Sequence, residues 1–326
     1  MLKTPKFWYQ KRGIISFLLY PLGLIYGVIA GVLRFVKLKK AESVGVPVIS
    51  IGNIVMGGSG KTPTAIALSK ILKEMGHTPH IITRGYGGEA RGPLFVNPEI
   101  HTFKDVGDEA LLLARAAPTW VDPMRVNAAF KAKESGATIL ILDDAHQNER
   151  LHKDLSLFVI DGKQMFGNEF VFPAGPLREF LSSGLKRADG IMLINTHEAI
   201  SGAIKNLNLK CHNATLKPTY DPRLLNHKVV AFSGLGFNQK FLETLKSEGF
   251  QISHFEDYPD HHPYVEKDLE YLVNIAQNCG AKLVTTAKDY VKIPARFKDD
   301  VHVVEVELEL SDLEEFKSWL KGQNLK

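Results

Sequence analysis

A glycine-rich run that ends in a lysine and a threonine is the strongest chemical signal in the chain. It occupies residues 57–62 and reads Gly-Gly-Ser-Gly-Lys-Thr. Glycines let backbone N–H groups turn inward around phosphate oxygens, and the N-terminus of a following helix adds partial positive charge. Lys61 is expected to reach the outer phosphates, and the Thr62 hydroxyl to help hold Mg²⁺. The run therefore predicts that the chain binds a nucleoside triphosphate.

The segments on either side of this run provide the context that a phosphate-binding loop needs. An apolar, strand-like segment at 46–51 precedes it, and apolar residues at helical spacing follow it over 63–75. The common pattern G-x-x-x-x-G-K-[ST] would place its first glycine at Val55, so the entry to the loop is predicted to be wider than usual. We assign nucleotide binding to consecutive residues, namely Val55, Met56, Gly57, Gly58, Ser59, Gly60, Lys61 and Thr62.

Two comparisons with other phosphate-loop proteins narrow the choice of nucleotide and of class. Membrane-positioning ATPases that switch between protein partners carry a second lysine five places before the first, where this chain has Met56. GTPases carry an Asn/Thr-Lys-x-Asp guanine clamp, and the nearest string here, Thr286-Ala287-Lys288-Asp289, lacks the spacer. ATP is therefore favoured over GTP as the nucleotide.

Two acidic pairs are candidates for metal binding and catalysis. Asp143-Asp144 ends the apolar run at 138–142, and the carboxyl end of a strand near a phosphate loop is where a Mg²⁺-binding aspartate lies. An ordinary turn would also use aspartate at this point. Asp108 and Glu109 begin a helical pattern, where acids commonly cap the helix and offset its dipole. A kinase nevertheless needs a carboxylate to accept the proton of the acceptor hydroxyl, so Asp108 is also a candidate base.

Four side chains in polar loops are further candidates. His261 lies in the dense polar turn 259–264, which is either a solvated loop or the source of a histidine that orients a catalytic acid. Adjacent side chains rarely converge on one ion, so a metal site in this turn is disfavoured. Arg84 and Tyr86 follow a strand-like run, and Arg178 lies in a proline-stiffened loop. Because arginine suits bidentate phosphate recognition, these three are candidates for substrate binding, although most surface arginines have no such role.

The positive charge of the chain is concentrated at its N-terminus. Residues 1–40 carry eight basic residues and no acid, so this segment has a charge of +8 and residues 41–326 have a charge of −4. Such a distribution argues against a basic groove for nucleic acid. The two cysteines, Cys211 and Cys279, lack metal-type spacing, which is typical of a reducing compartment.

Within that basic segment, residues 14–33 contain no charge. The run is too long for the apolar part of a signal peptide and has no small-residue cleavage site after it. A membrane-spanning helix is allowed by length, although Pro21 and three glycines weaken it, and basic residues on both flanks give no orientation. A helix in the membrane interface and a buried core helix are the alternatives. We expect attachment to the cytoplasmic face of a membrane, and whether the helix spans it stays open.

Beyond residue 40, strand-like and helical patterns alternate, which predicts an α/β fold with a parallel sheet covered by helices on both faces. A second alternating series begins near Lys228, after the polar, proline-bearing stretch 213–227. We therefore expect three parts: a membrane-associated helix at 1–40, a phosphate-loop kinase domain at 41–220, and a smaller α/β domain at 221–326. Two such domains commonly form a cleft, where the chemistry is expected.

Taken together, these strings resemble one family over nearly the whole chain, the tetraacyldisaccharide 4'-kinases, which are the lipid A 4'-kinases of Gram-negative bacteria. The matching runs in the N-terminal half begin at Phe7, Pro47, Gly57, Arg84, Gly107 and Asp143, reading FWY, PVISIGN, GGSGKTP, RGY, GDE and DD. Those in the C-terminal half begin at Pro173, Phe232, Pro259 and Lys288, reading PAGPLRE, FSG, PDH and KD. The family's phosphate loop also lacks the first glycine.

The resemblance implies ATP-dependent phosphorylation of the 4'-hydroxyl of a tetraacyldisaccharide 1-phosphate, giving lipid IVA at the inner membrane. By position, Asp108 resembles the general base and His261 its partner, while Lys61 and Thr62 match the contacts to phosphate and Mg²⁺. Glu109, Asp143 and Asp144 are then further metal-site candidates. The expected partners are the lipid A precursor and inner-membrane lipids, with no nucleic acid and no obligate protein partner.

One stretch departs from the family's pattern. Many members read Asp-Asp-Gly-Phe-Gln-His-Arg, whereas here Asp144 is followed by Ala-His-Gln-Asn-Glu, so that a histidine becomes Asn148 and an arginine becomes Glu149. This departure bears on the role of Asn148 rather than on the activity. The rival function is a membrane-tethered ATPase switch that acts on a protein partner, and Met56 in place of the second lysine argues against it. A soluble kinase for a small metabolite would leave the N-terminal run unexplained.

Overall fold

The computed structural model describes residues 5–38, 41–196, 209–323 and 325 of the chain. Its strands are β1 (Val48–Gly52), β2 (Pro79–Thr83), β3 (Leu94–Phe95), β4 (Thr119–Val121), β5 (Ile139–Leu142), β6 (Leu155–Asp161), β7 (Gly190–Ile194), β8 (Lys210–Thr219), β9 (Lys228–Ser233), β10 (Gln251–Asp257), β11 (Ala281–Thr286) and β12 (Val301–Leu310). Its helices are α1 (Ile14–Leu38), α2 (Lys61–Glu74), α3 (Phe103–Val106), α4 (Asp108–Ala114), α5 (Val126–Glu134), α6 (Leu181–Leu185), α8 (Asn238–Ser247), α9 (Glu266–Cys279), α10 (Ala287–Tyr290) and α11 (Leu313–Gly322). The predicted α/β fold is confirmed.

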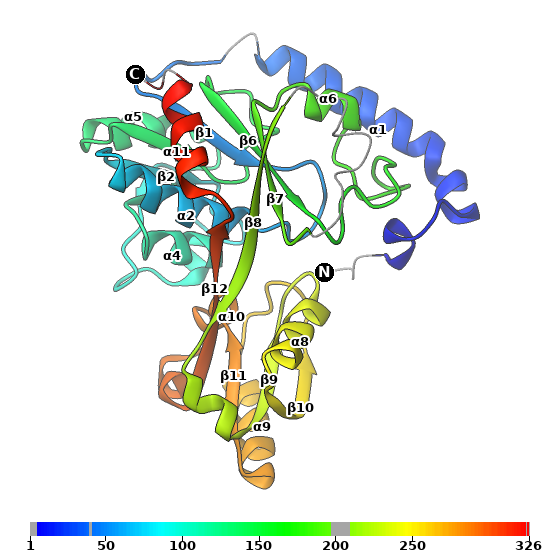
Figure 1. Cartoon of the computed structure of the whole chain (residues 1–326), viewed down its shortest axis with the longest axis vertical. Helices are drawn as coiled ribbons and strands as arrows, with labels where there is room; N and C mark the ends of the chain where they lie inside the picture. The colour runs from blue at the N-terminus through cyan, green and yellow to red at the C-terminus, as the bar shows by residue number, and fades with distance from the viewer. Residues whose placement is uncertain (1–4, 39–40, 197–208, 324, 326) are drawn as a thin grey trace.

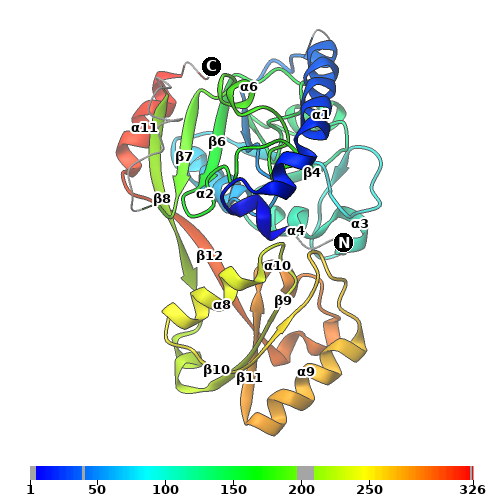
Figure 2. The ribbon, with the colours of Figure 1, turned by 90° about the vertical axis from the view of Figure 1, so that its right-hand side faces the viewer.

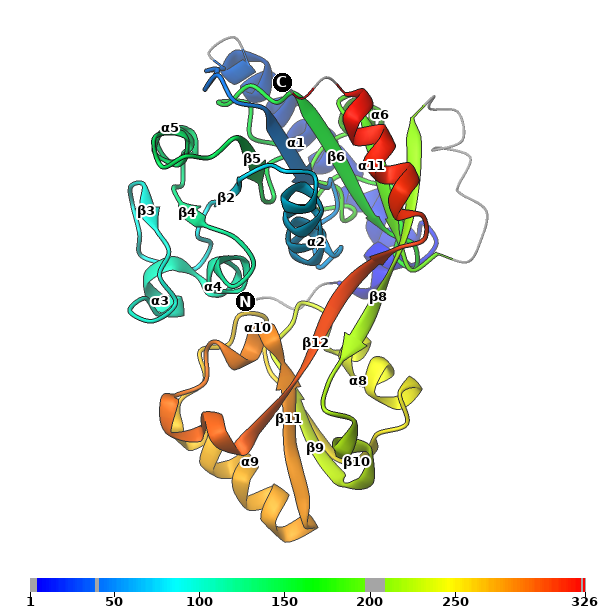
Figure 3. The same cartoon turned by 60° about the vertical axis from the view of Figure 1, so that its left-hand side comes forward.

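Two lobes share one continuous sheet of strand order β10-β9-β11-β12-β8-β7-β6-β1-β5-β2-β4-β3. Pairing within each lobe is parallel apart from the edge strand β3, whereas β8 and β12 pair antiparallel between the lobes. Figure 3 shows this two-stranded ribbon running from the upper lobe into the lower one. Residues 213–219 of the polar stretch that the sequence marks as a boundary belong to β8, in which buried or half-buried side chains alternate with exposed ones.

Both faces of the larger sheet are covered, which explains why its strands read as continuous apolar runs. Alternate side chains of β1 point to opposite faces: Ile49 and Ile51 pack with α2, α4 and α11, and Val48 packs with α5. In β6, Phe158 and Ile160 pack instead with α6. The smaller sheet repeats this arrangement, with α8 on one face and α9 on the other.

The C-terminal helix returns to the larger lobe. Phe316 and Leu320 of α11 are buried in the same apolar cluster as Ile49 and Leu68, because β12 carries the chain back along the ribbon (Figure 1). The boundary between the lobes at residue 220 stays a prediction. Helix α11, which was expected in the smaller lobe, packs on the larger one. We propose that the larger lobe comprises residues 41–220 together with α11.

Helix α1 lies along the outside of the larger lobe, beside α6 (Figure 2). Its inner face is made of small residues: Ser16 is buried, and a Cβ added to Gly23 or Gly27 would lie 2.7 Å from the Val171 carbonyl oxygen or 2.6 Å from the Phe180 ring. Among the described residues, α1 is the helix long and apolar enough to cross a membrane, and only 17% of that apolar window is buried. The alternative of a buried core helix is therefore wrong.

Candidate active site

The glycine loop joins β1 to α2 in the order that the sequence predicts. Gly57 and Gly60 have φ values of 122° and 86°, in the left-handed region that side chains disfavour. A Cβ on Gly60 would also lie 2.6 Å from Ile194 Cδ1. Asn53 Nδ2 donates to Ser59 Oγ over 2.6 Å, which fixes the inside of the loop. The two glycines and the Asn53–Ser59 hydrogen bond together fix the course of the loop backbone.

The entry to the loop is held by another segment rather than by a glycine. Met56 N donates to the Pro176 carbonyl over 2.8 Å, and Val55 forms a bridge with Leu177. Tyr9 OH donates to the Met56 carbonyl over 3.1 Å. Val55 is 8% exposed and packs in an apolar cluster, so its side chain faces away from the cleft, whereas Met56 lines it. This support explains how the loop manages without its first glycine.

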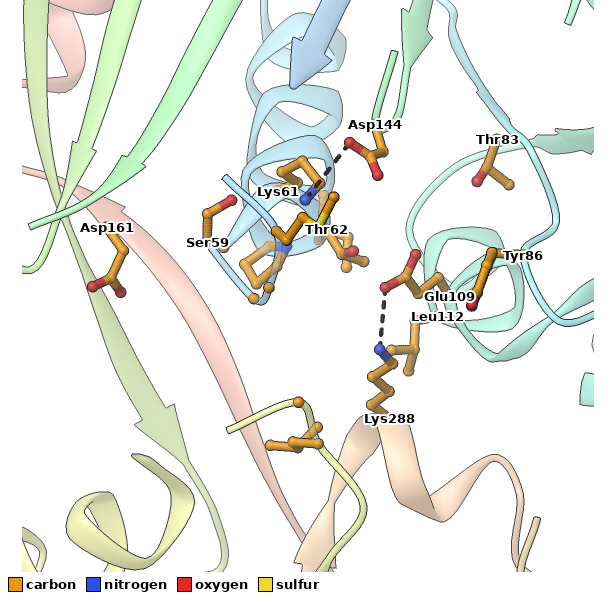
Figure 4. A pocket seen from close by; sticks show the side chains of 18 of the residues that line it. Ser59, Lys61, Thr62, Thr83, Tyr86, Glu109, Leu112, Asp144, Asp161 and Lys288 are labelled. Atoms are coloured by element: carbon orange, nitrogen blue, oxygen red, sulfur yellow. Dashed lines mark hydrogen bonds and ion pairs between the residues drawn. The ribbon is translucent and has the colours of Figure 1, made fainter. Parts of the chain in front are cut away.

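Lys61, Asp144 and Arg178 form a charged group beside the loop, and Figure 4 shows Lys61 pointing toward Asp144. Lys61 Nζ lies 3.6 Å from Asp144 Oδ1, and Arg178 Nη1 donates to the same oxygen over 3.1 Å. Partial burial would raise the pKa of Asp144, but the charges of Lys61 and Arg178 outweigh it and lower that pKa to about 2. The structure thus brings Arg178, a predicted substrate residue, to the phosphate side of the cleft.

Asp143 has the environment of a carboxylate prepared for a cation. Burial, followed by the charges of Glu109 and Asp144, raises the pKa of Asp143 to about 7. Its Oδ1 is buried without a hydrogen-bond partner, and Oδ2 accepts only a long 3.5 Å bond from Thr83. Among the described residues no three acidic, histidine or cysteine side chains form a complete metal cage. Mg²⁺ commonly takes one or two carboxylates and completes its shell with phosphates and water, so the residues present fit it.

On the opposite side of the cleft, the structure brings Asp108 and His261 together. His261 Nδ1 and Asp108 Oδ2 are 2.8 Å apart, although 153 positions separate them in the chain. Asp108 begins α4 and is 3% exposed, while His261 belongs to the smaller lobe. The Tyr86 ring packs against His261 with centroids 5.1 Å apart. Burial tends to raise the pKa of Asp108, but the His261 hydrogen bond and the Lys288 charge outweigh it and hold that pKa below its usual value.

Two lysines of the smaller lobe complete this arrangement, and neither was assigned a role from the sequence. Lys288 Nζ lies 3.2 Å from Glu109 Oε1 (Figure 4), and it lies 3.4 Å from His261 Nε2. Lys292 is 2% exposed, and its Nζ lies 3.8 Å from Asp108 Oδ2 and 2.9 Å from Asp289. The signal available in the sequence was the Lys288-Asp289 pair at the end of an apolar strand. The His261 tautomer that donates from Nδ1 and accepts at Nε2 satisfies both neighbours.

A cavity of about 1620 Å³ lies between the lobes. It is lined by the loop from Met56 to Thr62, by Glu109 and Asp144, and by His261 and Lys288. Arg84 and Tyr86 also line it, and Tyr86 is 49% exposed, as expected of residues free to meet a ligand. Residues of α1 reach the same cavity, so the cleft opens beside the apolar helix.

The departure from the family's pattern has a structural explanation. Glu149 is 5% exposed and lies among cations, with Oε1 at 3.3 Å from Arg187 Nε and Oε2 at 3.5 Å from Lys153 Nζ. An acid is therefore needed at this position in this chain. Asn148 lines the cavity, and its Oδ1 accepts a bond from Arg150 N over 3.0 Å.

A glycine loop on a parallel sheet, facing a buried carboxylate–histidine pair across a cleft, defines a kinase of the phosphate-loop class. Residues 15–324 match the family described as Tetraacyldisaccharide-1-P 4'-kinase. The chain belongs to this family.

Individual relatives agree. The chain is 44% identical over 310 residues to the tetraacyldisaccharide 4'-kinase of Paramagnetospirillum magneticum, covering 94% of both chains. It is 43% identical over 316 residues to that of Jannaschia sp., covering 95% of this chain and 96% of the relative. Among solved structures, the "apo" form of LpxK from Aquifex aeolicus in complex with ATP matches with a TM-score of 0.76 and 26% identity, over 95% of this chain and 99% of that one.

Proposed function

We propose that this chain transfers the γ-phosphate of ATP to the 4'-hydroxyl of a tetraacyldisaccharide 1-phosphate, giving lipid IVA for lipid A biosynthesis. The observation that carries the proposal is the position of the Asp108–His261 pair across one cleft from the phosphate loop. Family membership supports the choice of acceptor, and the Aquifex aeolicus protein, solved with ATP, supports the choice of donor. The alternative of a protein-partner ATPase switch has no support from these relatives.

In this reaction the donor side supplies charge and position. Lys61 and the loop amides bind the phosphates, and a fixed set of donors stabilises the charge that develops during transfer without reorganising. Mg²⁺ would be held by Thr62 and Asp143, with Asp144 and Glu109 beside them, and it neutralises charge on the outer phosphates when bound. Arg178 holds Asp144 in place and offers its remaining N–H groups to the phosphates.

On the acceptor side, Asp108 serves as the general base. Its carboxylate takes the proton of the 4'-hydroxyl while the hydroxyl oxygen attacks the γ-phosphorus and ADP leaves. His261 holds Asp108 through Nδ1, and Lys288 fixes the histidine tautomer through Nε2. Arg84 and Tyr86 line the same cavity, with Tyr86 against His261, and they would bind the sugar phosphate.

The acylated acceptor requires the enzyme to work at a membrane. Each buried CH₂ contributes about 0.8 kcal/mol to retention in the bilayer, so four acyl chains keep the substrate there. The outer face of α1 is apolar, with Ile14 80% exposed and Leu18 73% exposed. Its inner face remains packed on the larger lobe, and a helix that crossed the bilayer would lose these contacts. We infer that α1 lies in the interface on the cytoplasmic side, where ATP is available, and presents the cleft to the headgroup.

The test supplies ATP, Mg²⁺ and vesicles that contain the tetraacyldisaccharide 1-phosphate, and measures phosphorylated lipid. Wild type should form it, whereas the double variant Ile25→Ser, Ile29→Ser on the exposed face of α1 should bind vesicles about tenfold or more weakly. Burial of one isoleucine side chain contributes about 1.5–3 kcal/mol, which sets this expectation. Product formation should fall with vesicle binding, while ATP affinity measured without vesicles stays within about twofold of wild type.

The matched control is Ile25→Val, Ile29→Val, which keeps both positions apolar and should bind vesicles almost as wild type does. ATP hydrolysis by wild type without phosphorylated lipid would refute the kinase assignment. Unchanged vesicle binding by the serine variant would refute the assignment of α1 to the interface.

The raised pKa of Asp143 predicts a pH dependence of metal binding. At a pKa of about 7 the group is mostly neutral at pH 6 and mostly ionised at pH 8. Since Mg²⁺ binds the ionised form and releases the proton, apparent Mg²⁺ affinity should be about tenfold weaker at pH 6 than at pH 8. Titration calorimetry of Mg²⁺ into the ATP-bound protein at both pH values measures this difference.

Asp143→Asn provides the control, because ATP itself also binds metal less well as it takes up protons. The variant should retain only the nucleotide's own pH dependence and lose the additional change. An identical pH dependence in wild type and variant would show that Asp143 does not bind the ion.

A further inference from the structure

Arg34 interrupts the apolar surface of α1 with an inward-facing charge. Its Nη1 pairs with Glu179 Oε2, and its Nη2 donates to Ser183 Oγ over 2.7 Å. Its Nε lies 4.0 Å from Glu149 Oε1. The Arg34 side chain is 18% exposed and lines the cavity between the lobes. A helix that needed only lipid contacts would not place a paired arginine against the protein.

The partner of Arg34, Glu179, is a buried point where several donors converge. It is 2% exposed and accepts from Arg187 twice, over 2.9 Å and 2.8 Å. Gln147 Nε2 also lies 3.2 Å from Glu179 Oε1. Glu179 therefore keeps a cationic partner when Arg34 is removed, so such a change does not leave a bare charge in the interior.

From Glu179 the contacts continue to the phosphate loop. The Gln147 amide nitrogen donates to the Asn53 carbonyl over 2.7 Å, at the start of the loop. The Gln147 amide oxygen accepts from Arg178 Nη1 over 3.3 Å, and Arg178 reaches Asp144. Asp144 in turn lies 3.6 Å from Lys61 Nζ. Each step is a hydrogen bond or ion pair, so α1 and the phosphate-binding lysine belong to one contiguous network.

We propose that Arg34 is a positioning residue. It couples the binding of α1 to a lipid surface with the positions of the Gln147 and Arg178 side chains beside the phosphate loop. This inference rests on the proposed function, and it adds regulation of the kinase by the membrane. Lipid binding restrains α1, α1 fixes Arg34, and Arg34 holds Glu179 so that Gln147 stays aligned with both Asn53 and Arg178. The affinity of the loop for nucleotide then depends on whether α1 is bound to lipid.

The first experiment measures affinity for a fluorescent ATP analogue with and without vesicles that contain no acceptor lipid. Wild type should bind nucleotide about fivefold more tightly when vesicles are present, a modest coupling for two linked sites. Arg34→Gln should bind the vesicles equally well but show no gain in nucleotide affinity. The matched control is Arg12→Gln, because Arg12 is also a cation of the N-terminal segment but pairs with Glu169, outside the network. It should keep the full gain.

The second experiment tests whether Arg34 acts through Gln147. In a double-mutant cycle, Arg34→Gln and Gln147→Leu should each lower the vesicle-dependent gain, and the double variant should lose no more than either single change. Independent, additive losses would refute the relay, as would a full gain in Arg34→Gln. Loss of vesicle binding in Arg34→Gln would also overturn it, since Arg34 would then only fasten the helix. Absence of phosphorylated lipid with wild type would instead refute the kinase proposal. The two proposals can fail separately, because the nucleotide measurements use no acceptor lipid.

Discussion

Asp108→Asn is expected to lower kcat by about 10³-fold while ATP affinity stays within about twofold of wild type. A positioned general base contributes about 10²–10⁴-fold, and asparagine keeps the shape of the side chain but cannot accept the proton. The carboxylate is buried behind His261, which lines the cleft, and it has no contact with the glycine loop, so its loss leaves the nucleotide contacts in place. Steady-state kinetics with the acceptor lipid in mixed micelles, together with nucleotide titration, measures both quantities.

The control for this prediction is protein stability. Asp108 lies 3.8 Å from the buried Lys292, which keeps Asp289 as a partner at 2.9 Å after the substitution, so the variant should still fold. Thermal unfolding checks this point. A folded Asp108→Asn protein with turnover within about tenfold of wild type would show that another group takes the proton.

The same environment determines how the rate responds to acid. Although burial raises the pKa of Asp108, the hydrogen bond from His261 and the charge of Lys288 hold it below its ordinary value. A base with a lowered pKa stays ionised down to acidic pH, and its activity is lost only when the pH falls through that lowered value. A fall in rate near pH 7 at low Mg²⁺ therefore reports on Asp143, whose pKa is about 7.

Lys61→Met should also lower activity strongly, and unlike Asp108→Asn it should weaken nucleotide binding. We expect kcat/KM for ATP to fall by about 10²–10³-fold, because removing one preorganised donor to developing charge commonly costs that much. Nucleotide affinity should fall as well, in contrast to Asp108→Asn, since Lys61 meets the phosphates in the ground state too. Its methylenes are kept by methionine, and Asp144 retains Arg178 as a partner.

Lys73→Met is the matched control, because Lys73 lies on the same helix α2, is exposed, and does not line the cavity between the lobes. It should leave kcat and ATP affinity within about twofold of wild type. If Lys61→Met and Lys73→Met lose affinity equally, a general loss of positive charge is responsible, and the specific role of Lys61 is refuted.

Local sequence patterns predicted most of the fold. The apolar run that becomes β1 and the helical spacing that becomes α2 place the glycine loop almost to the residue, since such patterns depend on neighbours in the chain. The uncharged segment 14–33 likewise predicts a long apolar helix, and α1 extends it to Leu38. The stretch 213–227, expected as a boundary between domains, begins with the last residues of the ribbon strand β8, and its proline and polar residues did not indicate a strand.

The pairing of side chains across the cleft depended on the tertiary structure. From the residues alone, the first interpretation of Asp108 was an acid that caps the start of a helix. The first interpretation of His261 was a residue of a solvated loop. Only the packing of the smaller lobe on the larger one brings them within 2.8 Å. Similarly, Arg178 was a candidate for acceptor binding, and the loop carrying it turns the side chain to Asp144 on the phosphate side.

The sequence by itself therefore determined the chemistry of the donor and the apolar character of the N-terminal helix, because a glycine loop and an apolar helix are built from adjacent residues. Tertiary structure decided which distant charges meet: His261 with Asp108, Lys288 with Glu109, and Arg34 with Glu179. The physical reason is that the energy of a buried charge depends on partners that arrive with other elements of the fold, and no local pattern specifies them.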